Sequence, residues 1–131
     1  MASSVAWYND EQTILLTRFE DSIRYADLIA VNDHEARLLD SVQHPGGTIV
    51  DYEGVTRVPQ PVLSNLPQLV VNAPGINHPN ARIVVVVRAR PSIKLVYDTI
   101  LTVYTDLANR IAFARDPEEA LAIIRARGVD G

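Results

Sequence analysis

Residues 81–87 read Ala81-Arg-Ile-Val-Val-Val-Val87, and this run decides the fold. A continuous stretch of β-branched residues is typical of a strand that is buried on both faces of a parallel sheet. The turn-rich segment 72–80 precedes the run, and apolar residues at helical spacing follow it from Ile93 to Leu107. We therefore expect residues 83–87 to form the most buried strand, in the middle of an α/β domain.

Strands and helices alternate on both sides of this run. Segments 6–9 and 13–19 flank turn-forming residues and predict an opening hairpin. The pattern then predicts a helix over 22–42, a short strand over 48–52, a loop over 53–60 and a helix from Pro61, which Pro67 should kink or split. A last strand over 110–114 leads into a helix that is capped by the box 116–119 and stopped by Gly128.

This order predicts a mainly parallel sheet with an antiparallel edge strand, flanked by about four helices. The chain has 131 residues, of which 47% are hydrophobic and 21% charged, so we expect one α/β domain over residues 1–131. Asn32 and Glu35 interrupt the apolar stripe of the first long helix. Because buried charges are costly unless paired, this face is expected to reach the rim of the core there.

Composition argues against several classes of function. The chain has no cysteine, which excludes disulfides, thiolate zinc sites and cysteine nucleophiles. The net charge is −4 and the arginines are dispersed, which argues against nucleic acid as a partner. The longest apolar run, Ile83 to Val87, is far shorter than the ~20 residues that span a bilayer. With no signal peptide pattern, a cytoplasmic protein without a membrane span is expected.

The sequence shows no recognisable catalytic or metal-binding pattern. His34, His44 and His78 have no partner at the i, i+4 spacing of a helical metal site and are expected to be solvated. A nucleophile elbow, a phosphate loop and a dinucleotide fingerprint are all missing from the sequence. We therefore expect the protein to have no metal, no cofactor and no enzymatic activity. An enzyme of unknown type is the weakest of the alternative functions.

Residues 49–58 read Ile-Val-Asp-Tyr-Glu-Gly-Val-Thr-Arg-Val and lead into a helix, and residues 113–121 read Phe-Ala-Arg-Asp-Pro-Glu-Glu-Ala-Leu, a strand followed by a capped helix. Together with the order of the elements, these two stretches resemble the STAS (SpoIIAA-like) domain family. The resemblance implies a regulatory module that binds a protein partner, with a regulatory kinase and self-association as alternatives. It also implies a docking face around Gly54 to Gln60 and the helix 61–71, with these residues on it: Thr56, Arg57, Gln60 and Ser64.

The family's phosphorylation switch is expected to be absent from this chain. Members that are switched carry a serine or threonine hydroxyl at the start of the helix, where this chain reads Pro59-Gln60-Pro61-Val62. A phosphate would be stabilised at a helix N-terminus, but a hydroxyl is needed to accept it. Thr56 and Ser64 are the nearest hydroxyls, and we interpret them as a turn hydroxyl and a helix-surface hydroxyl.

A polar rim at the start of the second long helix offers an alternative function. Arg88, Arg90, Ser92 and Lys94 follow the buried run, and Asp51 ends the neighbouring strand. Ligands of open α/β sheets bind beyond the carboxyl ends of strands, and a helix N-terminus with guanidinium groups suits an anion. The alternative is thus a domain that binds a small anionic ligand, such as a nucleotide, or an apolar one. Equally, the arginines would keep the loop in water, and Asp51 would tie down the loop after it.

Overall fold

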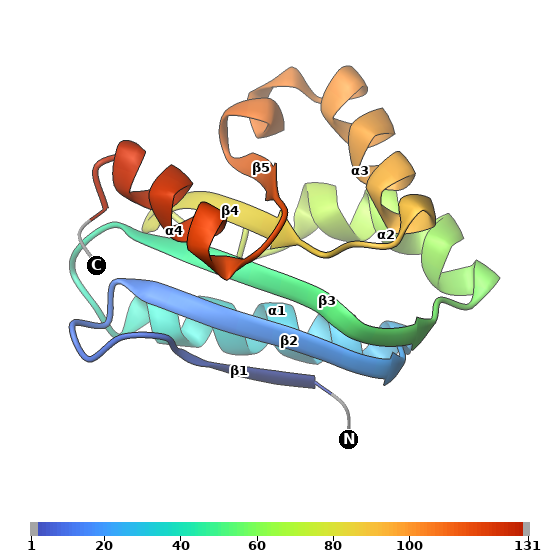
Figure 1. The fold of residues 1–131 in the computed structure, drawn as a ribbon, viewed down its shortest axis with the longest axis horizontal. Helices are drawn as coiled ribbons and strands as arrows, with labels where there is room; N and C mark the ends of the chain where they lie inside the picture. Colours follow the sequence, from blue (N-terminus) through green and yellow to red (C-terminus); the bar gives the residue numbers. More distant parts are fainter. Residues whose placement is uncertain (1–2, 130–131) are drawn as a thin grey trace.

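The computed structural model describes residues 3–129. Within them, five strands form one sheet whose order across the sheet is the order along the chain, and Figure 1 shows four α-helices around it. The strands are β1 (Ser3–Trp7), β2 (Ile14–Ser22), β3 (Gly46–Arg57), β4 (Ala81–Val87) and β5 (Ile111–Ala114). The helices are α1 (Tyr25–Asp40), α2 (Gln60–Asn72), α3 (Pro91–Val103) and α4 (Pro117–Ala126), and the 3-10 helix η1 (Thr105–Asn109) follows α3.

The sheet has the predicted directions. β1 is antiparallel to β2, while β2, β3, β4 and β5 run parallel to one another, which confirms a mainly parallel sheet with an antiparallel edge strand. Residues 83–87 lie in β4 with side chains at most 4% exposed, as a strand covered on both faces requires. By strand order the middle of the sheet is β3, and β4 is its inner neighbour.

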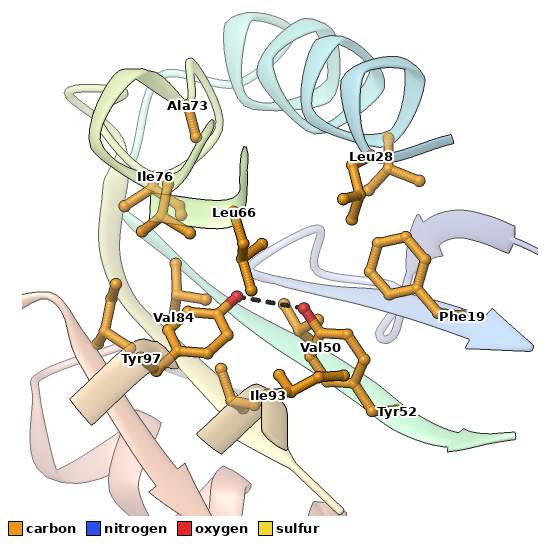
Figure 2. Packing of buried hydrophobic residues seen from close by; sticks show 14 of the residues in the cluster. Phe19, Leu28, Val50, Tyr52, Leu66, Ala73, Ile76, Val84, Ile93 and Tyr97 are labelled. Carbon is orange, nitrogen blue, oxygen red and sulfur yellow. Dashed lines mark hydrogen bonds between the residues drawn. The ribbon is translucent and has the colours of Figure 1, made fainter. Parts of the chain in front are cut away.

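Helices cover the two faces of the sheet unequally. α1, α2 and α3 share one face and α4 takes the other, since successive right-handed crossovers that progress in one direction stay on one side. The α4 core is made of Ile14, Ile49, Ile83, Val85, Val87, Ala120, Ile124 and Val129. The α1–α3 core is larger and includes Leu15, Val31 and Val70. Figure 2 labels further members of it: Phe19, Leu28, Val50, Tyr52, Leu66, Ile93 and Tyr97.

The loop predicted over 53–60 is wrong for its first half, because β3 continues to Arg57. The extension pairs with the last residues of β2, Glu20 with Gly54 and Asp21 with Val55, across two irregularities in the register. Gly54 permits this pairing because a Cβ there would lie 2.8 Å from Glu20 Cγ. What sequence patterns indicate as a glycine loop is therefore a close approach of two strands.

The helix ends follow local chemistry. In α4 the Asp116 side chain accepts a hydrogen bond from the Glu119 N–H at 2.9 Å, Pro117 occupies the first turn, and Gly128 follows the helix with a φ of +83°. Pro67 lies inside α2, which is one helix from residue 60 to 72, so the predicted split does not occur. α3 ends at Val103, earlier than the apolar pattern predicts, and η1 carries Leu107 into the core.

Candidate functional site

Asp51 does not end its strand as expected but lies midway along β3, opposite Val87 at the end of β4, and is only 5% exposed. Its Oδ1 accepts a hydrogen bond from the Glu53 N–H at 2.9 Å, which fixes the backbone that follows, one of the two roles expected from the sequence. Asp51 also lines a hollow of about 420 Å³ together with Arg18, Glu53 and Arg88. The carboxyl edge of the sheet is thus hollowed, with acidic and basic groups side by side.

Arg88 is the first residue after β4, and its φ of +56° is unusual for a residue with a side chain. The guanidinium makes an ion pair with Glu53, so one carboxylate already neutralises it. Arg88 also lines a second hollow, of about 290 Å³, together with Lys94 and Arg115 among others. Arg115 is paired in turn with Glu119, its Nε 2.9 Å from Glu119 Oε2. Arg88 is therefore common to both hollows.

The remaining rim residues do not converge on one site. Arg90 precedes the first turn of α3 and its Nε donates to the Val55 carbonyl oxygen at 3.0 Å, which fastens the start of α3 to the end of β3. Ser92 is exposed, and neither hollow includes it. Lys94 places its Nζ 5.6 Å from the centre of the Phe113 ring. Arg88 thus lines one hollow with Lys94 and the other with Asp51. Arg90 lines neither hollow and instead bonds to the backbone of β3.

The residues expected on a docking face are all at the surface. Thr56 and Arg57 are exposed at the end of β3. Gln60 and Ser64 are exposed on the first two turns of α2, where Gln60 Nε2 donates to Ser64 Oγ at 3.3 Å. All thirteen residues of α2 are uncharged. Its outer surface consists of uncharged side chains: Gln60, Pro61, Ser64, Asn65, Gln68 and Asn72.

The outer surface of α3, which packs against α2, is apolar to an extent that the sequence pattern missed. Leu95 and Val103 are each 67% exposed, and Tyr104 is 47% exposed. The spacing predicted Val103 and Tyr104 on the buried face, which is wrong because α3 ends at Val103. We call the exposed residues of the two helices together the charge-poor face, because it holds only two charged residues, Lys94 and Asp98 of α3.

Glu35 is buried, which corrects the expectation that it lies at the rim of the core. Its side chain projects from α1 onto β2, where Thr17 Oγ1 donates to Glu35 Oε2 at 2.6 Å. The residue is 5% exposed. Burial raises the pKa of Glu35 to about 7, against the hydrogen bond from Thr17, which lowers it. Periodicity alone could not reveal this contact, because the partner hydroxyl lies on another element.

Two buried tyrosines lie beside this carboxyl group. The hydroxyls of Tyr52 and Tyr97 are 3.2 Å apart (Figure 2), and the ring of Phe19 stacks on Tyr52 with centroids 5.3 Å apart. Burial raises the pKa of Tyr97 to about 12 and that of Tyr52 well above its ordinary value. Both phenols are therefore neutral at physiological pH. Glu35, Tyr52 and Tyr97 line a small cavity of about 30 Å³ in the α1–α3 core.

His78 is not solvated as expected from the sequence. Its side chain is 12% exposed, with Nε2 placed 2.6 Å from Asp40 Oδ1, and its Nδ1 accepts from the Asn80 N–H. These bonds fasten the loop before β4 to the end of α1. Across residues 3–129, no three His, Cys, Asp or Glu side chains are placed to hold a metal ion. In the same range, no helix is both long enough and apolar enough to cross a membrane.

The chain has the fold of STAS domains, as comparison with solved structures shows. The anti-sigma factor antagonist SpoIIAA in its unphosphorylated form matches with a TM-score of 0.60 over 99% of this chain and 100% of that chain. The two sequences are 13% identical, so the likeness concerns the fold. No protein-family model and no curated protein matches the chain.

Proposed function

We propose that this chain is a regulatory protein-interaction module that docks a partner protein through the charge-poor face of α2 and α3. The observation that carries the proposal is the exposure of Leu95 and Val103, each 67%, beside a helix that is uncharged over its whole length. The cores of protein interfaces are depleted in charged residues, and contiguous apolar groups left in water mark interaction sites. The SpoIIAA match supports this class, since that protein is named as an antagonist of another protein.

Docking on this face would be independent of phosphorylation at the start of α2. That helix begins at Gln60 with Pro59 as its N-cap residue and Pro61 in its first turn, so residues 59–62 offer no hydroxyl. Ser64 lies one turn further along and is bonded to Gln60. Docking would therefore not be switched by a phosphate at residues 59–62. A kinase and a second copy of this chain are the partners named by the STAS resemblance, and both would use the same face.

The experiment is capture of a partner from an extract of the source cells by the immobilised chain, followed by binding measurements with the purified partner. Leu95→Glu should weaken binding at least about tenfold, because a carboxylate at an interface core loses its water without gaining a partner. Ala122→Glu on α4 is the matched control, since Ala122 is also exposed on a helix. Both variants should melt like the wild type, as surface changes shift stability by only about 0.5 kcal/mol.

Equal capture by the two variants would overturn the proposal, as would the absence of any specific partner. Sedimentation of the purified chain distinguishes the form of the partner. A dimer that Leu95→Glu dissociates and Ala122→Glu does not would identify a second copy as the occupant of the charge-poor face.

Anion binding at the Arg88–Lys94 rim stays the second candidate. The observation that favours it is the hollow shared by Arg88, Lys94 and Arg115. Lys94 is the cation there that makes no ion pair with any residue between 3 and 129. Since two of the three cations already have a carboxylate, an incoming anion would compete with Glu53 and Glu119, and we rank this function below protein docking.

A further inference from the structure

A groove of about 230 Å³ runs between α1 and α2 on the outside of the molecule. Beneath it lies the small cavity of the α1–α3 core that Glu35 lines. Asn32 and Leu69 line both spaces, so the groove and the cavity adjoin at these two side chains. The walls of the groove are mostly apolar or aromatic, from Tyr25, Ile29, Leu69, Ala73 and Pro74.

Two oxygen atoms without a donor meet where the groove reaches the cavity. The Thr17 hydroxyl donates a hydrogen bond to Glu35 Oε2, whereas Glu35 Oε1 has no hydrogen-bond donor among residues 3–129. Asn32 donates its Nδ2 to the Leu28 carbonyl oxygen, which leaves its Oδ1 as an acceptor. A Cβ built on Gly75 would lie 2.6 Å from Glu35 Oε1 and 3.4 Å from Asn32 Oδ1, so both oxygens lie close to one point. Both oxygens keep some contact with solvent, so a donor group of a ligand can reach them.

The charges around this point have one sign. Asp33 is the charged residue of the groove and Glu35 that of the cavity, and both are acidic. The rings of Phe19, Tyr52 and Tyr97 line the inner wall, and aromatic faces attract cations. We propose that the groove between α1 and α2 binds a small organic amine, whose apolar body lies between the helices and whose ammonium group donates to Glu35 Oε1 and Asn32 Oδ1.

The size of the site sets the class of ligand. Drug-sized ligands occupy sites of roughly 300–1,000 Å³. The groove, at about 230 Å³, suits a fragment with one ring or a short alkyl chain. An ammonium group carries three donors, enough for both oxygens and a further acceptor. Because burial raises the pKa of Glu35 to about 7, the ionised carboxylate that an ammonium requires forms as the pH rises through neutrality. The other acid at the groove is Asp33, and Tyr52 and Tyr97 stay neutral.

The test uses three probes of one shape and different charge: 2-phenylethylamine, 2-phenylethanol and phenylacetate. Amide NMR spectra of the chain at about pH 8, where Glu35 is mostly ionised, should show saturable shifts with the amine at Ile29, Asn32, Leu69 and Ala73. The alcohol and the acid should bind at least about tenfold more weakly, because a charge-assisted hydrogen bond is stronger than a neutral one. Amine affinity should fall when the pH is lowered below the pKa of Glu35, because the carboxyl group is then protonated.

Glu35→Gln removes the charge with little change in shape and should weaken amine binding at least about tenfold. The matched control is Glu11→Gln, which changes the net charge equally at an exposed carboxylate between β1 and β2 and should leave amine affinity unchanged. If Glu35→Gln fails to fold, Leu69→Trp closes the groove from its half-buried outer wall and should also abolish binding. Equal affinity of all three probes, undiminished amine binding by the variants, or shifts centred on Arg18 and Asp51 instead would overturn the proposal.

Discussion

The cores on the two faces of the sheet differ in composition. The α4 core is aliphatic throughout, from Ile14 on β2 to Ile124 on α4, and the half-buried residues packed on it are aliphatic too. The α1–α3 core contains Tyr52 and Tyr97 and adjoins the buried polar pair of Thr17 and Glu35. The α4 core thus consists of close-packed hydrocarbon, although Asp51 shares that face of the sheet beside the hollow that Arg18 and Arg88 line. The α1–α3 core holds ionisable and hydrogen-bonding groups beside a cavity.

Because of this difference, the α4 core contributes mainly stability, while the α1–α3 core holds the groups that can ionise and form hydrogen bonds. Aliphatic packing contributes roughly 25 cal/mol for each Å² of surface that it buries and depends little on pH. A buried carboxyl group lowers stability whenever it is charged, so its presence makes sense where a ligand or a partner supplies the missing contact. The three predictions below test whether the two cores differ in this way.

The largest effect is expected from placing a carboxylate in the α4 core. Val85 is fully buried there, and the core offers no donor comparable to Thr17. Val85→Asp should prevent folding, because an unpaired buried charge costs several kcal/mol against a total stability of roughly 5–15 kcal/mol. Thermal unfolding followed by circular dichroism checks this, with the isosteric Val85→Thr as a control that keeps a cooperative transition. A cooperative melt of Val85→Asp near the wild-type temperature would contradict the comparison.

A smaller effect is expected from pH, and only in the α1–α3 core. Glu35 has a pKa of about 7 in the folded chain, against 4.5 for the ordinary group. Folding thus favours the protonated form, so stability is complete below about pH 4.5 and is lost as the pH rises through about 7. The loss should be on the order of 3 kcal/mol, since one pKa unit corresponds to about 1.4 kcal/mol.

Urea unfolding of the wild type and of Glu35→Gln between about pH 4 and pH 8 measures this loss. Subtracting the two free energies of unfolding cancels the contributions of all the other titrating groups. The wild type should become less stable relative to the variant as the pH rises. If the difference in unfolding free energy between the wild type and Glu35→Gln does not change with pH, then Glu35 is solvated or paired in solution.

The smallest effect tests how tightly the α4 core is packed. A Cβ on Gly47 would lie 2.7 Å from Ile124 Cγ2, so Gly47→Ala should destabilise the fold by about 1–3 kcal/mol through overpacking. Ile124→Ala makes room for that methyl group at its own cost. A double-mutant cycle should therefore show that the two changes together cost less than their sum, by about 1 kcal/mol or more. Strict additivity would mean that this face is looser than the structure indicates.

The elements of the fold were predictable because their signals are local. The β-branched run of β4 and the capping residues before α4 each specify an element within a few residues of sequence. The exact end of β3 was not predictable, since Gly54 reads as a loop residue until β2 is known to lie against it. The end of α3 was missed for a similar reason, because its apolar pattern continues into η1.

The candidate sites were harder to predict than the fold. Glu35 looked like a rim residue because its donor, Thr17, lies eighteen residues away on another element. Arg90 stays a candidate for the anion site, and its Nε also donates to the Val55 carbonyl oxygen, a contact that the sequence did not indicate. In both cases residue type indicates what a group is able to do, while its actual partner depends on tertiary contacts that no local pattern carries. The uncharged composition of α2 was visible in the sequence and is the signal that could have directed attention to the charge-poor face.

The strand order also bears on how the chain is made. Since the strands lie in the order of synthesis, each strand that leaves the ribosome finds its neighbour already in place. The α1–α3 side can therefore assemble progressively during translation. The opposite side cannot, because Ile49, Ile83 and Val85 stay in water until α4 emerges last. The emerging chain thus passes through a stage with an exposed aliphatic sheet face, which lasts until α4 packs on it.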